Sequence, residues 1–258
     1  MSSSRPKRAA HQFVAGARWS RWSGFASPGG KLQNHLFVLL CLISSALRAE
    51  DSFGIVTQVS SDWIYHGTTE TRGEPTVGIN LEWHPNRHWF VGLEAHEARR
   101  PAVPQRERSI MGYVGFGWQM TPSWYTTVSL QQREFPGSTK EWDLTEVGLE
   151  LSHHRGFSLA IDYSPDYYEH NTTAVATEFK YRHSIGQHRT LYGTVGALEF
   201  GRKAFPDYRY AQVGGTVAWG STSLDLSYGW NSADGDTRFG REALRSPELL
   251  LQLAFRLR

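Results

Sequence analysis

The sequence predicts an all-β protein: a transmembrane antiparallel up-and-down β-barrel of about twelve strands, preceded by a cleaved signal segment. Three observations predict it. Apolar and polar residues alternate from Phe53 to the C-terminus, the connections are alternately short and long, and the polar face of the strands carries charge. Alternation with a period of two is typical of a strand whose two faces meet different surroundings.

The chain divides into an N-terminal region, 1–49, and a barrel domain, 50–258. The apolar run LFVLLCLI at 36–43 is followed by the small residues of SSALRA at 44–49. This run is too short for a transmembrane helix, and it is typical of a secretory signal peptide cut after Ala49. The stretch before it is long for a signal peptide and is basic, so we expect either a start codon placed too early or a presequence.

Removing this region changes the charge of the protein. Of the 27 Lys and Arg residues, seven lie in 1–49, which has no Asp or Glu, so 20 remain against 25 acidic residues, a net charge of −5. The basic character of the whole chain is therefore no evidence for a nucleic-acid partner. The single cysteine, Cys41, lies in the apolar run, which excludes disulfides and cysteine-ligated metals in the exported protein.

Twelve segments alternate well enough to be strands. Their predicted ranges are 53–66, 75–84, 88–97, 108–119, 123–133, 142–153, 156–164, 172–183, 189–200, 208–219, 222–231 and 247–257. Long, polar connections are expected at 67–74, 98–107, 134–141, 165–171, 201–207 and 232–246, and the connections between them are short. Short turns at one rim and long loops at the other are the anatomy of bacterial transmembrane barrels, with both chain ends at the short-turn, periplasmic rim.

The charge on the polar face distinguishes a membrane barrel from a soluble one. A small dry core cannot hold many ions, because each unpaired buried ion costs several kcal/mol. A wet lumen and an apolar outer wall remove this cost, and a closed sheet satisfies every backbone group in the bilayer. We therefore expect the nine inward charges to be pore-lining candidates: Glu82, Glu94, Glu146, Glu150, Asp162, Glu178, Lys180, Arg182 and Asp225.

Aromatic residues gather near the predicted strand ends, as in the girdles at the two lipid–water interfaces. Five tryptophans flank short turns: Trp83, Trp89, Trp118, Trp124 and Trp219. The aromatic residues assigned to the long-loop girdle are Trp63, Trp142, Trp230, Tyr163, Tyr167, Tyr168, Tyr208 and Tyr228.

The motifs SDWIYHGTTE at 61–70 and GEPTV at 73–77 resemble the first strand and its sequel in the TorF-type porin family of bacterial outer-membrane proteins. In this chain His66 stands where that family usually has Arg. The segment YSPDYY at 163–168 and the hairpin over 208–228 are also similar to the family. The resemblance covers most of 53–258 and implies an outer-membrane barrel with a pore role but no defined substrate.

No catalytic or cofactor-binding motif emerges, so we expect no enzyme, no cofactor and no metal. The adjacent His153 and His154 point to opposite faces of a strand and are poorly placed to chelate one ion. His183-Ser184 resembles the histidine–serine pair of some lipid-A deacylating barrels, without a surrounding motif. Glu146 and Glu150 lie about 13 Å apart along a strand, too far for a carboxylate pair.

The expected function is passive diffusion of small solutes or ions through a narrow outer-membrane pore after signal-peptide export. The expected partners are outer-membrane lipid, the solutes and the barrel assembly machinery. The inward charges are seven acids and two bases, or four bases with Arg133 and Arg256, which predicts a slight cation preference. The alternative is a structural or binding barrel with a closed lumen whose long loops contact partners. The sequence does not specify the oligomeric state or whether loop 232–246 folds inward as a constriction.

Overall fold

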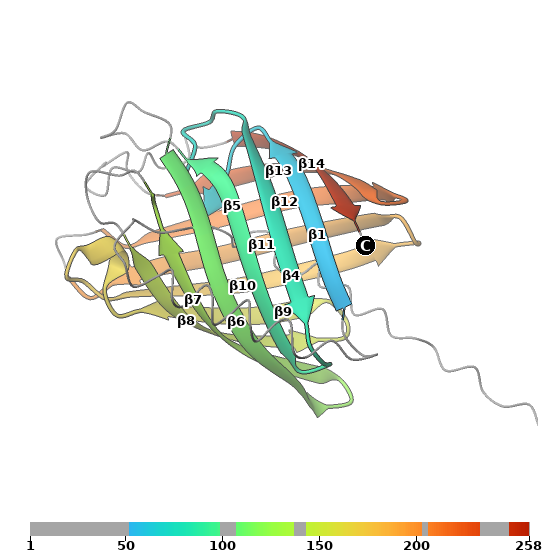
Figure 1. The fold of residues 1–258 in the computed structure, drawn as a ribbon, viewed down its shortest axis with the longest axis horizontal. Helices are drawn as coiled ribbons and strands as arrows, with labels where there is room; N and C mark the ends of the chain where they lie inside the picture. The colour runs from blue at the N-terminus through green and yellow to red at the C-terminus, as the bar shows by residue number, and fades with distance from the viewer. Residues whose placement is uncertain (1–51, 99–106, 137–142, 203–205, 233–247, 258) are drawn as a thin grey trace, which may run out of the picture.

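Twelve antiparallel strands close into one barrel in the computed structural model, which describes residues 52–98, 107–136, 143–202, 206–232 and 248–257 (Figure 1). The wall strands are β1 (Ser52–Ser60), β4 (Thr76–His84), β5 (Trp89–Ala98), β6 (Glu107–Thr121), β7 (Trp124–Glu134), β8 (Leu144–His153), β9 (Phe157–Ser164), β10 (Ala174–Ile185), β11 (Arg189–Phe200), β12 (Tyr208–Trp219), β13 (Thr222–Asn231) and β14 (Glu248–Leu257). The fold predicted from the sequence is confirmed. The signal segment and Trp142 lie outside the described residues.

Closure depends on the first strand, which pairs with both β4 and β14. Ser60 is in register with Thr76 on one side and with Gln252 on the other. No sheet edge is left open in the wall, so the backbone groups of every strand have partners, as a bilayer requires. No helix in the described part of the chain is long and apolar enough to cross a membrane.

The two rims of the barrel differ as the sequence predicts. Tight turns such as 154–156 and 186–188 join strands at one end, which we call the short-turn rim, and Ser52 and Leu257 lie there too. The longer connections lie at the other end, the long-loop rim. The described strand bounds agree with the predicted ones to within two residues, except at the end of the first strand.

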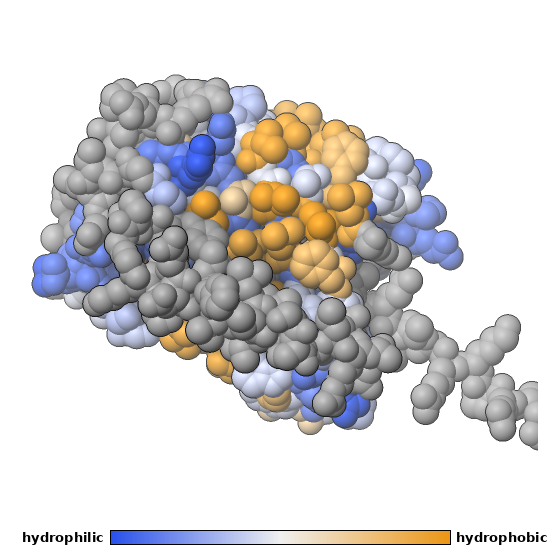
Figure 2. Space-filling view, viewed as in Figure 1, coloured by the Kyte–Doolittle hydropathy of each residue, from blue (hydrophilic) through white to orange (hydrophobic). Residues whose placement is uncertain are grey.

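The alternation places apolar side chains outside and polar ones inside. Outward residues such as Val77, Val213 and Leu249 are 61%, 61% and 63% exposed, whereas inward Arg133 and Asp162 are 1% exposed. Hydrophobic residues form a band on the face drawn in Figure 2, with hydrophilic residues toward its two ends. This arrangement is inverted relative to a soluble barrel and matches a lipid-facing wall.

The short-turn aromatic girdle is present. Trp89, Trp124 and Trp219 are exposed near the turns of that rim. At the long-loop rim Tyr163, Tyr228 and Trp230 face outward. Four other residues assigned to this girdle lie buried inside the barrel, so their assignment was wrong: Trp63, Tyr167, Tyr168 and Tyr208.

The first predicted strand, 53–66, and the external loop predicted at 67–74 were wrong in part. The wall strand ends at Ser60, and the chain then turns inward to form a two-stranded sheet of β2 (Ile64–Tyr65) and β3 (Thr68–Thr69) inside the barrel. The apolar Ile64 and Tyr65 continue the strand-like pattern, so composition alone does not reveal that the chain leaves the wall. We call residues 61–73 the plug hairpin.

Candidate functional site in the barrel lumen

The plug hairpin turns at His66 and Gly67. Both residues have positive φ, +44° and +72°, as the two central residues of a type I′ hairpin turn require. A Cβ on Gly67 would lie 2.3 Å from the Tyr210 ring, so only glycine allows this close approach to the wall. The turn is fixed from the wall as well, since Asn231 Nδ2 donates to the Gly67 carbonyl (2.5 Å) and Tyr208 Oη to the His66 carbonyl (2.9 Å).

Asp62 organises the base of the plug hairpin. Its Oδ1 accepts hydrogen bonds from the Trp63 backbone N–H (2.7 Å), from Thr69 Oγ1 (2.6 Å) and from the Thr71 hydroxyl. Burial raises the pKa of Asp62 above its ordinary value, although these donors oppose the shift. Thr69 Oγ1 in turn accepts from the Arg72 N–H (2.7 Å). One buried carboxyl group thus holds both legs of the hairpin together.

Arg133, on the inner face of β7, ties the plug hairpin to the wall. Its Nη1 donates to Glu70 of the hairpin and to Tyr168 Oη (2.8 Å). Its guanidinium carbon lies 3.5 Å from the centroid of the Tyr65 ring. Arg133 is almost completely buried, so its charge is balanced by protein groups rather than by water.

Each of two buried histidines lies between two carboxylates. His66, at the tip of the hairpin, has Nε2 3.2 Å from Glu146 Oε1 and Nδ1 3.8 Å from Glu178 Oε1. Burial works against a charged ring there, but the two carboxylates outweigh it and raise the pKa of His66 above its ordinary value. Tyr65 Oη also donates to Glu146, and Tyr210 Oη donates to Glu178 (2.6 Å).

The second histidine, His96, lies on β5. Its Nε2 is 3.1 Å from Glu70 Oε2, and its Nδ1 is 3.6 Å from Glu94 Oε1. Trp63 stacks on the imidazole at a centroid distance of 4.0 Å and lies over Gly78, where any Cβ would collide with the indole. The hairpin is therefore fixed to β5 by a ring stack and a histidine–carboxylate contact at the same point.

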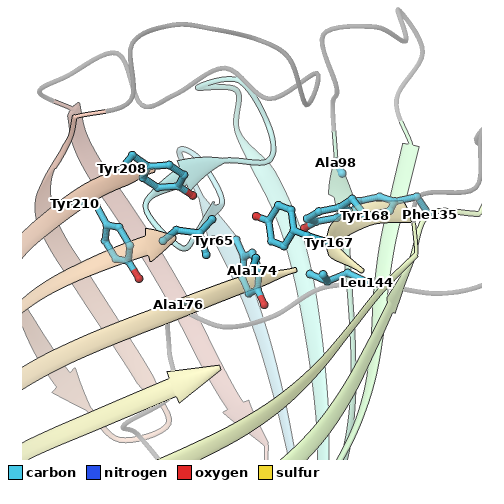
Figure 3. Close-up of a cluster of buried hydrophobic side chains, with 11 residues drawn as sticks. Tyr65, Ala98, Phe135, Leu144, Tyr167, Tyr168, Ala174, Ala176, Tyr208 and Tyr210 are labelled. Carbon is cyan, nitrogen blue, oxygen red and sulfur yellow. The ribbon is translucent and has the colours of Figure 1, made fainter. Parts of the chain in front are cut away.

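Tyrosine rings fill the remaining space at this end of the lumen (Figure 3). Tyr65 comes from the hairpin, Tyr167 and Tyr168 from the single-turn helix η2 (Tyr167–Glu169), and Tyr208 and Tyr210 from β12. Tyr168 adopts a left-handed φ of +52°, which is rare for an aromatic residue and persists only where packing over-determines it. The long-loop half of the lumen is thus packed like a protein core.

A small cavity of about 20 Å³ remains between the hairpin and the wall. It is lined in part by His66, Gly67, Glu178, Thr194 and Tyr210. Its volume suits a single water molecule, for which the polar lining offers partners. It is too small for an organic solute.

The short-turn half of the lumen is more open to solvent. The side chains of Glu82 and Lys180 are 18% and 16% exposed, against 0–3% for His66, Glu146 and Glu178. Polar contacts in this half join side chains of the wall strands, for example Thr216 Oγ1 donating to Asp225 (2.6 Å) and Tyr192 Oη donating to the same carboxylate (2.7 Å). Solvent therefore reaches the charges here but not those around the plug hairpin.

All nine predicted inward charges point into the barrel, on the faces opposite the exposed apolar residues. Glu94, Glu146, Glu150, Asp162 and Glu178 are buried, while Glu82, Lys180, Arg182 and Asp225 are half-buried. Lys180 pairs with Glu178 on its own strand (2.5 Å). Glu146 and Glu178 lie on either side of His66, which contacts both carboxylates.

Sequence reasoning missed Asp62, Glu70 and His96 as members of this site. His96 could have been found, because it continues the inward alternation of Glu94. The turn His66-Gly67 between Tyr65 and Thr68 was a hairpin signal at the boundary between the predicted strand 53–66 and the predicted loop 67–74. Loop 232–246, considered as an inward-folding segment, lies almost wholly outside the described residues. His183 and Ser184 lie exposed at the short-turn rim, away from the plug hairpin.

The described residues hold no group of three or more His, Cys, Asp or Glu side chains that could bind a metal ion. The histidine–carboxylate clusters use their nitrogen and oxygen atoms on one another and on Arg133. Their geometry is that of contacts that fix a segment inside the barrel.

Comparisons with known proteins show which solved structures share this fold. No protein-family model and no curated protein match the sequence. Among solved structures the chain is similar to the KdgM porin, with a TM-score of 0.52 and 8% identity over 80% of this chain and 98% of that one. It is also similar to LpxR from Salmonella typhimurium, with a TM-score of 0.48 and 7% identity over 79% and 99% of the two chains.

At such low identity the likeness to the KdgM porin establishes the fold alone. The protein therefore has the fold of a porin-like outer-membrane β-barrel. In such barrels the long loops face the exterior and the short turns face the periplasm.

Proposed function

We propose that the protein is an outer-membrane channel for small solutes or ions, narrowed in its exterior half by the plug hairpin. One observation carries the proposal: an inward-folded segment occupies the exterior half of a lumen whose periplasmic half is charged and partly solvated. Folding one segment into the barrel reduces the bore without breaking any wall hydrogen bond. Membership of the TorF-type porin family is part of this proposal.

The pore-lining residues in this proposal fall into two groups. Glu82, Lys180, Arg182 and Asp225 line the wider, periplasmic vestibule. Glu94, Glu146, Glu150, Asp162 and Glu178 surround or lie beneath the constriction. Acids outnumber bases among them, so a slight cation preference is expected, and reversal potentials in a salt gradient across a planar bilayer measure it. A clear anion preference would contradict this part of the proposal.

Single-channel recording tests the role of the plug hairpin. Ser60 and Thr76 are already paired across β1 and β4, so a short turn can replace residues 62–72 without moving the wall. We expect small, steady conductance from the wild-type protein and a severalfold larger conductance from the deletion variant. Unchanged conductance after deletion would show that the hairpin is not the constriction. Heat-modifiable gel mobility serves as the control for barrel formation.

The second candidate is a closed-lumen barrel that acts through its exterior loops. The near-complete burial of Tyr65, His66 and Arg133, with a cavity of only about 20 Å³ beside them, favours it. The same recordings separate the two candidates. A closed barrel gives no wild-type conductance under any applied potential, yet it conducts once the hairpin is deleted.

The route to the membrane is also proposed from the sequence. Residues 1–49 would direct export and be removed, and the assembly machinery would insert residues 50–258 into outer-membrane lipid. N-terminal sequencing of protein extracted from outer membranes tests this boundary. A first residue well before Glu50 would overturn it.

A further inference from the structure

Two neighbouring turns at the short-turn rim gather basic side chains. Strands β9 and β10 are paired, and the Arg182 N–H donates to the Gly156 carbonyl (2.9 Å), so the β8–β9 turn lies beside the end of β10 that leads into the β10–β11 turn. We call their basic residues the rim patch: His153, His154, Arg155, His183, His188 and Arg189. All except the half-buried His153 are exposed.

No carboxylate neutralises the rim patch from these turns. Residues 153–157 and 183–190 contain no Asp or Glu, and neither do the other short-turn connections at 84–89, 119–124 and 218–223. The nearest acids along the flanking strands, Glu150, Asp162 and Glu178, point into the lumen. At the long-loop rim both signs occur on exposed residues, for example Arg108, Arg209 and Glu97.

Three members of the rim patch project on the lipid-facing side of the wall. By strand alternation His153 shares the outward face with Leu149, His183 with Phe179 and Tyr181, and Arg189 with Leu191. His153 is the last residue of β8 and Arg189 is the first residue of β11, while His183 lies two residues before the end of β10. They therefore lie where the apolar wall ends.

An aromatic cluster borders the rim patch on its membrane side. Phe157 lies 4.7 Å from Tyr181 and 6.2 Å from Phe179 between ring centroids. His153 contacts Trp124 at 4.6 Å. Aromatic rings of this kind lie at the headgroup level of a bilayer, so the basic groups just beyond them lie at the depth of the lipid phosphates.

From this placement we propose that the rim patch binds the phosphate groups of anionic phospholipids in the leaflet beside the short-turn rim. Arginine presents paired N–H donors that match phosphate oxygens, and histidine rings add further N–H donors. The lipid occupant follows from position, because the cations border the lipid-facing wall rather than the lumen mouth. The proposal depends on the membrane orientation of the wall and is independent of channel activity.

Lipid retention by the refolded full-length protein tests this proposal. The protein is exposed to an equimolar mixture of phosphatidylglycerol and phosphatidylcholine, and the lipids that stay bound are counted by native mass spectrometry. We expect wild-type protein to prefer phosphatidylglycerol, with each arginine contributing roughly fivefold. The variant R155Q/R189Q should lose most of this preference.

The matched control is R108Q/R209Q, which removes two outward-facing, exposed arginines from the opposite rim. It should retain the wild-type preference for phosphatidylglycerol. Equal lipid ratios for wild type and R155Q/R189Q, or equal losses in both variants, would overturn the proposal. Heat-modifiable mobility of each variant confirms that the barrel is formed before lipids are compared.

Discussion

At the scale of single residues, Arg133 has the largest role in the lumen. It is one buried cation among several carboxylates, and it contacts the plug hairpin through Glu70 and Tyr65. Removing one partner of a buried ion pair leaves the other charge without compensation, which costs more than the pair itself contributes. The packing of the hairpin therefore depends on this side chain more than on any exposed charge.

The substitution Arg133→Met is expected to destabilise the barrel by about 3–5 kcal/mol, because buried Glu70 loses its guanidinium partner. Urea titration of the protein refolded in vesicles measures the loss. The double variant R133M/E70Q should recover part of it, since both charges are then removed. Arg209→Gln, on the exposed outer face, is the control and should change stability little. A loss of equal size in both single variants would contradict the role given to Arg133.

At the scale of elements, the plug hairpin combines a local turn rule with a long-range fit. The positive φ values of His66 and Gly67 allow the tight turn, and the missing Cβ of Gly67 allows the turn to lie against Tyr210. The tight turn is not sufficient without the close approach, because a hairpin that could not approach Tyr210 on β12 would not fit in the lumen.

Gly67→Val should prevent the hairpin from reaching its site, because the new side chain would overlap the Tyr210 ring and disfavour the left-handed backbone. If the hairpin forms the constriction, channel conductance should rise toward that of the deletion variant. Gly112→Ala is the matched control, since a Cβ there meets nothing within 4 Å. A Gly67→Val protein with wild-type conductance would place the constriction elsewhere.

At the scale of the whole molecule, the barrel separates an apolar exterior from a charged interior. Each of the twelve strands contributes side chains to both surfaces through the same alternation. Substitutions on one strand can therefore compare the lipid-facing surface with the lumen. On β12 the adjacent Val213 and Gln212 point to opposite sides of the wall, toward lipid and lumen respectively.

Val213→Arg should destabilise the barrel in vesicles by about 2–4 kcal/mol, since it places a charge near the middle of the lipid-facing wall. Gln212→Arg on the same strand should cost less, because it faces polar groups in the lumen. The difference between the two variants in urea titration is the measurement. Similar costs for both substitutions would argue against a lipid-facing outer wall.

The sequence by itself determined the barrel, its approximate strand bounds and the direction in which the nine charged residues of the wall strands face. These follow from local rules: alternation assigns faces, and turn lengths assign rims. The nine inward charges could be named for the same reason, since a residue such as Glu146 faces inward whatever lies across the lumen.

Only the tertiary structure decided what fills the lumen. The segment 61–66 has strand-like residues, and whether it extends the wall or turns inward depends on contacts with residues far along the chain, such as Arg133, Glu146 and Tyr210. The same holds for the partner of Glu146 and Glu178, since both carboxylates contact His66 of the plug hairpin. Local pattern fixes which face a side chain occupies, but the energy that seats the plug hairpin comes from long-range packing and charge pairing, which no single stretch of sequence contains.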